Sequence, residues 1–132
     1  MRYLTAAEVI RINEAEAGSW NLRDFGLVDS AVHRPQTVVL GHEAFPDVHA
    51  KAAALMHSLA KNHAFIDCNK RTAFLACAMF YRLNGWDLRM GDDDVVHLMG
   101  DIVVDKLDVN EIARVLEQHA IQSIVDERRA DS

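Results

Sequence analysis

Residues 63–73 read HAFIDCNKRTA, and this stretch lies between two amphipathic helical patterns. Its second half predicts a helix that opens with Lys70 and Arg71 in the first turn. Acidic side chains are usual at that place, because the free N–H groups of a helix N-terminus carry about half a positive charge. Two cations there cost roughly a few tenths of a kcal/mol each unless an anion accompanies them. The pattern therefore predicts an anion site, and phosphate suits the N–H groups and both side chains.

The remaining residues of the stretch suit phosphoryl or nucleotidyl transfer. We interpret His63 as the base, because its reference pKa of ~6.5 lies near neutrality. Asp67 is the predicted Mg²⁺ ligand, since Mg²⁺ prefers carboxylate, water and phosphate oxygens, and its alternative role is to cap the helix. Asn69 is expected to donate its amide to a phosphate oxygen, and Phe65 is expected to anchor the loop in the core.

Amphipathic patterns on both sides of the stretch predict a mostly helical chain. Apolar residues at helical spacing indicate one long helix over about 47–61 and a second over about 69–83. Thr5 and Glu8 form a capping-box pattern at the start of the first helix. Three further predictions are a short helix over 24–34, a helix capped by Asp92, and a helix with a capping box at Asp108 and Glu111.

Residues 36–45, QTVVLGHEAF, interrupt the helical pattern. The β-formers of 37–40 are followed by Gly41, which predicts a small hairpin or an extended flap. The predicted fold is therefore all-α, a small helical bundle with a short β-hairpin flap. The flap precedes the helices that carry residues 63–73, which we call the reactive stretch. We expect a single domain over 1–125 and a polar C-terminal tail over 126–132.

Length, charge and cysteine content limit the classes of function. The 132 residues suit one compact domain. The net charge of −6 argues against a broad nucleic-acid-binding surface, because such surfaces concentrate positive charge. No apolar run approaches the ~20 residues that span a bilayer, and the N-terminus has no signal-peptide pattern. Cys68 and Cys77 form neither a disulfide framework nor a zinc pattern, so we expect a cytoplasmic protein. The charge and the short apolar runs together predict no direct nucleic-acid partner and no membrane partner.

The reactive stretch resembles the Doc branch of the Fic/Doc superfamily, whose motif reads H-x-F-x-[DN]-x-N-K-R. Six residues match it: His63, Phe65, Asp67, Asn69, Lys70 and Arg71. Residues 22–27 and 34–36 resemble Doc sequences as well, and the resemblance extends over about residues 3–120. It implies a small all-α domain in which the motif lies on a loop that runs into a helix.

Departures from the wider Fic pattern, H-P-F-x-x-G-N-G-R-x-x-R, favour one activity over another. Cys68 and Lys70 stand in place of two glycines, and Phe74 stands in place of the final arginine. A glycine at the second place lets the backbone approach a nucleotide phosphate, whereas a lysine fills that space and adds charge. In the Doc branch this change accompanies ATP bound in the reversed sense, which implies a protein kinase that transfers the γ-phosphoryl group. The alternatives are a Fic-type protein adenylyltransferase and a non-catalytic protein-binding module.

The resemblance also implies a biological setting. A Doc-like protein is the toxin of a toxin–antitoxin pair, and it would use ATP and Mg²⁺ to phosphorylate a threonine of elongation factor Tu and so halt translation. The flap would dock this target by β-augmentation, a role that falls on Thr37, Val38, Val39, Leu40 and Gly41. The partner would be a Phd-like antitoxin whose disordered tail folds as an inhibitory helix. A self-inhibitory Fic pattern is incomplete here, because Arg128 follows Ser123 and Glu127 where Gly or Asn is required.

Overall fold

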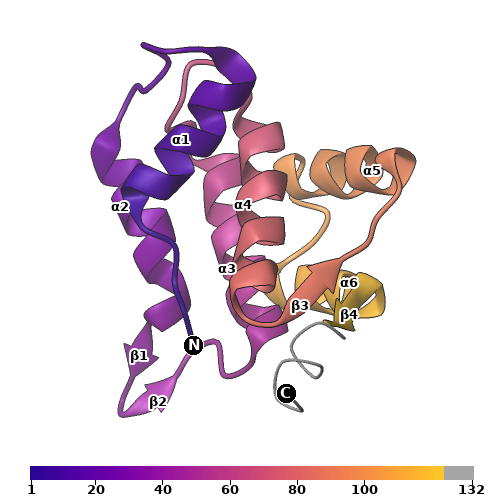
Figure 1. Cartoon of the computed structure of the whole chain (residues 1–132). Helices are drawn as coiled ribbons and strands as arrows, with labels where there is room; N and C mark the ends of the chain where they lie inside the picture. The colour runs from indigo at the N-terminus through magenta and orange to yellow at the C-terminus, as the bar shows by residue number, and fades with distance from the viewer. Residues whose placement is uncertain (124–132) are drawn as a thin grey trace, which may run out of the picture.

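Six α-helices and four short strands make up residues 1–123, the part of the chain that the computed structural model describes (Figure 1). The helices are α1 (Ala6–Ala17), α2 (Phe25–His33), α3 (Val48–Lys61), α4 (Asn69–Leu83), α5 (Asp92–Val103) and α6 (Val109–His119), with a 3₁₀ turn η1 (Arg34–Gln36). The strands are β1 (Val38–Val39), β2 (His42–Glu43), β3 (Trp86–Leu88) and β4 (Ala120–Gln122). The prediction of a small all-α fold with a short hairpin is confirmed. The predicted tail over 126–132 lies outside the described residues. The same holds for Glu127 and Arg128 of the incomplete self-inhibitory pattern.

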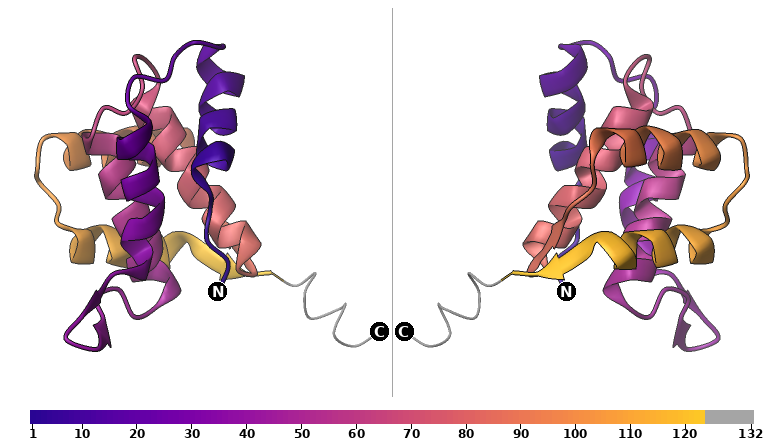
Figure 2. Two further views of the ribbon diagram at one scale, coloured as in Figure 1. Left: turned by 90° about the vertical axis from the view of Figure 1, so that its left-hand side faces the viewer. Right: turned by 90° about the vertical axis from the view of Figure 1, so that its right-hand side faces the viewer.

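Helices α3 and α4 form the centre of the molecule. Helices α1 and α2 lie on one side of this pair, and α5 and α6 lie on the other (Figures 1 and 2). Ala52, Ala53 and Ala60 of α3 and Ala76 of α4 are buried, and such small side chains let two helices lie close together. Larger buried side chains at the predicted helical spacing surround this contact, namely Leu55, Met56, Leu59 and Phe80. Among the described helices, none has the length and apolar character needed to cross a membrane.

Side-chain caps explain where several helices begin. The predicted capping boxes are confirmed in Thr5 with Glu8 and in Asp108 with Glu111. The prediction for α5 is wrong in one respect, because Gly91 is the N-cap and Asp92 is the first helical residue. Asp92, Asp93 and Asp94 all lie in the first turn of α5. They stabilise the helix through its dipole and not through a cap hydrogen bond.

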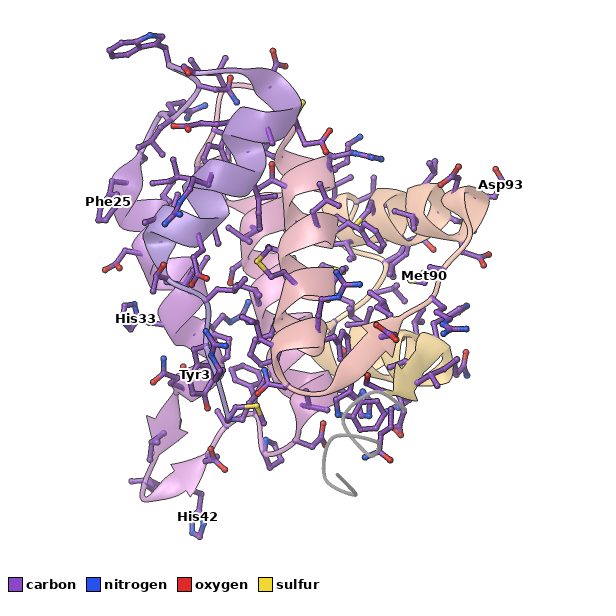
Figure 3. All side chains as sticks on the ribbon, viewed as in Figure 1. Tyr3, Phe25, His33, His42, Met90 and Asp93 are labelled. Carbon is purple, nitrogen blue, oxygen red and sulfur yellow. The ribbon has the colours of Figure 1, made fainter. Side chains whose placement is uncertain are left out.

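The predicted flap is confirmed as a hairpin of β1 and β2. The two strands pair antiparallel, with Val38 opposite Glu43, and His42 marks the hairpin in Figure 3. Leu40 and Gly41 form the turn with φ angles of 51° and 79°. A two-residue hairpin turn of this type requires two left-handed residues, which explains the glycine after the β-formers.

The helix predicted over 24–34 is confirmed as α2, with Asp24 as its N-cap and Arg34 as its C-cap. Pro35 then lies within η1, because its fixed φ suits the first turn of a helical segment. A second antiparallel pair, β3 with β4, joins Trp86 to Gln122 and was not predicted. Strands of three residues are too short to show a period-2 pattern, so pairing over this sequence distance left no local signal.

Candidate functional site

A pocket of about 520 Å³ opens where the loop after α3 meets the N-terminus of α4. Five of the six motif residues line it, namely His63, Asp67, Asn69, Lys70 and Arg71. Ala60, Ile66, Cys68 and Val103 complete its wall. The structure therefore brings the predicted base, metal ligand and phosphate-binding residues around one cavity. The sixth motif residue, Phe65, lies in the core with 2% of its surface exposed, where a loop anchor is expected.

The loop has an uncommon backbone conformation at both of its ends. His63 has a φ of 52° and Cys68 a φ of 63°, so two non-glycine residues occupy the left-handed region. Each such residue costs roughly 1–2 kcal/mol relative to the right-handed conformation. Contacts around the loop must offset this cost. Backbone strain of this kind is concentrated at functional sites of proteins.

Asn69 closes the loop on itself. Its Nδ2 donates to the carbonyl oxygen of Phe65 at 2.8 Å, and its Oδ1 accepts from the N–H of Phe65 at 3.1 Å. These two bonds fasten the start of α4 to a buried residue of the loop. An amide nitrogen carries two hydrogens, so one remains for the predicted contact with phosphate. That contact stays a prediction, whereas the loop-closing role was not anticipated from the sequence.

The N-terminus of α4 differs from those of the other helices within residues 1–123. Its N-cap, Cys68, makes no side-chain hydrogen bond to the free N–H groups. Helix α5 also lacks such a bond, but three aspartates in its first turn balance the helix dipole. Helix α4 instead has Lys70 and Arg71 in its first turn and no acidic residue. Uncapped N–H groups and two cations beside a pocket have the composition of an anion site.

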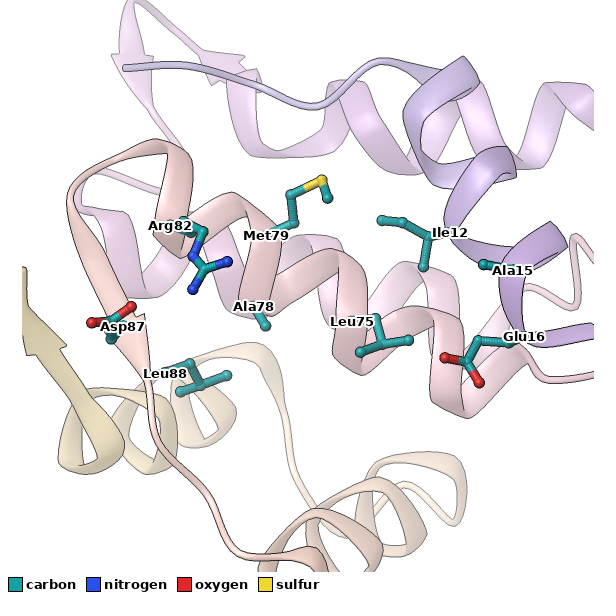
Figure 4. Close-up of a pocket in the computed structure, with 9 residues that line it drawn as sticks. All are labelled: Ile12, Ala15, Glu16, Leu75, Ala78, Met79, Arg82, Asp87 and Leu88. Atoms are coloured by element: carbon teal, nitrogen blue, oxygen red, sulfur yellow. The ribbon is translucent and has the colours of Figure 1, made fainter.

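Arg71 forms a surface ion pair with α1. Its Nε lies 3.3 Å from Oε2 of Glu16, and the contact leaves the two terminal guanidinium nitrogens for other partners. Glu16 also lines a second pocket, a groove of about 440 Å³ between α1, α4 and β3 (Figure 4). The Glu16–Arg71 pair therefore lies between the motif pocket and this groove. An exposed pair of this kind contributes little stability, about 0–1 kcal/mol, so a phosphate can compete for the arginine.

Asp67 suits a Mg²⁺ ion that arrives with a nucleotide. Its side chain is exposed and lines the pocket, and the alternative role as helix cap is not seen because Cys68 is the N-cap. In the described part of the chain, no group of three or more His, Cys, Asp or Glu side chains is arranged to hold a metal ion. Mg²⁺ is usually held by one or two carboxylates together with water and phosphate oxygens. A single carboxylate next to a predicted phosphate site fits that coordination.

The departures from the Fic pattern lie at or near the predicted phosphate site. Lys70 is exposed at the pocket, in the position of the second motif glycine. Phe74, in the position of the final arginine, is half-buried and packs against the hydrophobic core. Its helix position therefore supplies no second guanidinium to the pocket. The site has one arginine and one lysine where a Fic adenylyltransferase has two arginines and a glycine.

The predicted docking flap does not border this pocket. The hairpin precedes α3 and the motif loop follows it, at opposite ends of this helix (Figure 2). The 14 residues of α3 span about 21 Å. Val38, Val39 and Leu40 are nevertheless 60%, 55% and 94% exposed, which is unusual for apolar residues. The sheet of β1 and β2 has two strands, so the outer edge of β1 has no strand partner among the described residues. The docking role of the flap stays a prediction.

A buried lysine fastens the flap to α3. Nζ of Lys51 donates to Oε1 of Glu43 in β2 and to the carbonyl oxygen of Pro35, both at 3.0 Å. Burial by itself would lower the pKa of Lys51, but the contacts with Glu43 and Tyr3 raise it by more than burial lowers it. The net shift of the pKa is therefore upward. The ammonium group therefore stays charged and holds the base of the hairpin in place.

Sequence reasoning missed two buried amides beneath the motif loop. Asn13 of α1 and Asn21 after it both bond to the backbone of Asp67, about fifty positions further along the chain. The one signal available was Asn13 itself, four residues after the buried Val9 and hence on the apolar face of α1. Asn21 lies in the segment between α1 and α2, where no periodic pattern marks a residue as buried.

Comparisons with known proteins agree with the motif. A sequence profile described as the Fic/DOC family matches residues 3–81. A protein named Toxin Doc from Mycolicibacterium smegmatis is 42% identical over 118 residues, which cover 86% of this chain and 90% of that protein. A protein named Protein kinase doc from Escherichia phage P1 is 29% identical over 89 residues, which cover 64% of this chain and 70% of that protein. The resemblance to the Doc branch is thereby confirmed.

Proposed function

The chain belongs to the Fic/DOC family, and on this basis we propose that it is the toxin of a toxin–antitoxin pair and acts as an ATP-dependent protein kinase. The observation that carries the proposal is Lys70, exposed in the first turn of α4 beside a pocket that His63 and Asp67 also line. A lysine there fills the space through which the backbone of a glycine would approach a nucleotide phosphate. Together with the loss of the second arginine at Phe74, this disfavours the ATP orientation that AMP transfer requires.

Each pocket residue has a separate task in this proposal. His63 accepts the proton of the target hydroxyl as the hydroxyl oxygen attacks the γ-phosphorus of ATP. The new bond joins that oxygen to phosphorus, the bond to the β–γ bridging oxygen breaks, and ADP leaves. Asn69, Lys70 and Arg71, with the N–H groups of α4, stabilise the charge that develops on the phosphate oxygens. Asp67 would hold Mg²⁺, which would supply positive charge to neutralise the phosphates of a bound nucleotide.

The proposed acceptor is a threonine of elongation factor Tu, whose modification would halt translation. Support comes from the two relatives, one named a toxin and the other a protein kinase. The exposed β1 edge offers main-chain groups to an extended segment of the target. Because about 21 Å of α3 separates the flap from the pocket, an extended segment that contacts the flap must reach at least about six residues away from the threonine. A short peptide around the threonine should therefore be a poorer substrate than the folded target, and Leu40→Ser should raise the KM for the folded target alone.

Two labelled forms of ATP test the proposal. The chain is incubated with Mg²⁺, a bacterial lysate and ATP labelled on the γ-phosphate or, in parallel, on the α-phosphate, and the labelled protein is then identified. A kinase transfers only the γ-label, so label from the α-phosphate on the target would show an adenylyltransferase instead. No label from either nucleotide, with partner binding retained, would support a non-catalytic protein-binding module.

His63→Ala is the matched variant for this assay. We expect it to abolish transfer while nucleotide binding survives, because the phosphate-binding groups lie on α4 and His63 lies at the other end of the loop. Transfer at the wild-type rate by His63→Ala would refute the assignment of the base. Loss of both transfer and binding would show that the histidine holds the nucleotide and does not only move a proton.

The proposed antitoxin is a Phd-like protein whose tail folds as a helix on the toxin. The groove of Figure 4 suits an amphipathic helix, because Ile12, Leu75, Met79 and Leu88 give it an apolar wall. Met79→Glu should weaken the complex with the antitoxin, which co-purification and calorimetry measure. Val96→Glu replaces another exposed apolar residue, on α5, and should leave the complex intact. Equal effects of the two variants would place the helix elsewhere.

A further inference from the structure

Two buried amides lie directly beneath the motif loop. Asn13 is 1% exposed and Asn21 is 8% exposed, and they come from α1 and from the segment that follows it. Nδ2 of Asn21 donates to Oδ1 of Asn13 at 2.9 Å, so the two side chains form a pair. Polar groups buried to this degree are costly unless all of their hydrogen-bonding positions are used.

Three hydrogen bonds of the pair go to the backbone of one residue, Asp67. Oδ1 of Asn21 accepts from the N–H of Asp67 at 3.2 Å, while Nδ2 of Asn21 and Nδ2 of Asn13 both donate to its carbonyl oxygen, at 2.8 and 3.1 Å. The second hydrogen of the Asn13 amide goes to Oγ1 of Thr72, buried in α4, at 3.0 Å. All four amide hydrogens of the pair are therefore used. The orientation of Asn21 is also fixed, because only its oxygen can face the N–H of Asp67.

These bonds act at a residue of the loop that no helix, strand or bridge holds. The backbone of Asp67 lies between the left-handed residues His63 and Cys68 and belongs to no helix or strand. Its N–H and C=O are held from the side of α1, while its carboxylate lines the pocket. The N–H of Ile66 also donates to the carbonyl oxygen of Asn21, at 2.8 Å. Asn21 therefore supports the loop through its main chain as well as through its side chain.

From this arrangement we propose that Asn21, assisted by Asn13, is a positioning residue that fixes the backbone of Asp67 and thereby sets where its carboxylate enters the pocket. Its effect on phosphoryl transfer rests on the proposed function. Two apolar side chains would fill the same space without any buried amide to satisfy. Apolar residues would leave the N–H and C=O of Asp67 without partners, so the amides supply what this loop in particular needs.

Asn21→Ala tests the proposal, and Asn84→Ala is its matched control. The carboxamide of Asn84 also makes three hydrogen bonds, two with the backbone of Arg2 and one with the carbonyl oxygen of Phe80, all at 2.8 Å. It lies just after the C-terminus of α4, at the far end of that helix from the pocket. Amide hydrogen exchange at Asp67 and γ-phosphoryl transfer are measured for wild type and both variants, at a temperature where all are folded.

We expect Asn21→Ala to speed exchange at Asp67 by ~10-fold or more relative to the core of α3, because the acceptor of that N–H is gone. Transfer should fall by ~10–100-fold, as misplacement of a reacting group by about 1 Å costs that much. Asn84→Ala should change neither the exchange rate nor the transfer rate by more than ~2-fold, even if it lowers the melting temperature as much as Asn21→Ala does. Asn13→Ala, which keeps Asn21 on Asp67, should give a smaller change in the same direction and serves if Asn21→Ala does not fold.

Other results overturn the proposal. Exchange at Asp67 that is no faster in Asn21→Ala than in Asn84→Ala would show that Asn21 does not fix the loop. Faster exchange with transfer reduced no more than in Asn84→Ala would show that loop position does not set the rate. A wild-type chain that transfers no phosphoryl group would refute the proposed function, and the exchange measurement would still decide whether Asn21 positions Asp67.

Discussion

Asn69→Ala should separate two roles of one side chain, the closing of the loop and the binding of phosphate. The variant removes two hydrogen bonds to the backbone of Phe65, a residue with 2% of its surface exposed. Each bond contributes about 0.5–1.5 kcal/mol, so the free energy of unfolding should fall by about 1–3 kcal/mol. For a chain of this length that corresponds to a drop of roughly 4–12 °C in melting temperature.

Urea denaturation measures the loss of stability, and calorimetry measures the affinity for ATP with Mg²⁺. Asn62→Ala is the control, because Asn62 also makes two hydrogen bonds to backbone groups, those of Leu27 and Ala64, yet does not line the motif pocket. Both variants should lose similar stability, and only Asn69→Ala should lose nucleotide affinity. A stability loss below ~0.5 kcal/mol for Asn69→Ala would refute the loop-closing role. Equal loss of affinity in both variants would refute the phosphate contact.

Three further outcomes are expected. Lys70→Gly should reduce γ-phosphoryl transfer in the labelled-ATP assay, and full activity would count against the role given to this lysine. Phe65→Ala should lower the free energy of unfolding in urea by about 3–5 kcal/mol, since it empties a core position, and a loss below ~1 kcal/mol would mean that the loop is anchored elsewhere. Burial and the positive charges of Arg34 and Lys61 lower the pKa of His57, so the unfolded chain binds more protons below pH ~6.5 and stability should fall on acidification. His57→Gln, which keeps an acceptor for Arg34, should flatten that decline between about pH 7.5 and 5.5, and an unchanged slope would contradict the assignment.

The helices and the pocket could be predicted because their signals are local. Thr5 with Glu8, and Asp108 with Glu111, are three residues apart, so the geometry of one helical turn brings each pair together. The motif residues lie within nine positions at a loop–helix junction, which places five of the six around one cavity almost irrespective of the rest of the chain. The hairpin of β1 and β2 was equally local, because Gly41 follows directly on the β-formers.

Features that depend on distant segments could not be predicted. The pairing of Trp86 with Gln122 depends on how α5 and α6 return the chain to α4, and no residue in either strand encodes that path. The flap and the pocket are separated by the length of α3. The motif gives no information on this separation, because it covers only residues at one end of α3. Asn21 shows the same limitation most clearly, because only tertiary structure brings it to the backbone of Asp67, 46 positions away.

Several unfavourable features of this fold lie around the motif pocket. Left-handed His63 and Cys68 together cost roughly 2–4 kcal/mol, and two cations at an uncapped helix N-terminus add a few tenths of a kcal/mol each. Domains are stable by only about 5–15 kcal/mol in total, so this is a considerable fraction. A module that used its surface only to hold a partner would gain stability by losing these features, through a glycine at Cys68 or an acidic residue at Lys70. Their presence together favours a site at which an imidazole, a carboxylate and a bound anion must meet, and it therefore favours the catalytic proposal over the protein-binding alternative.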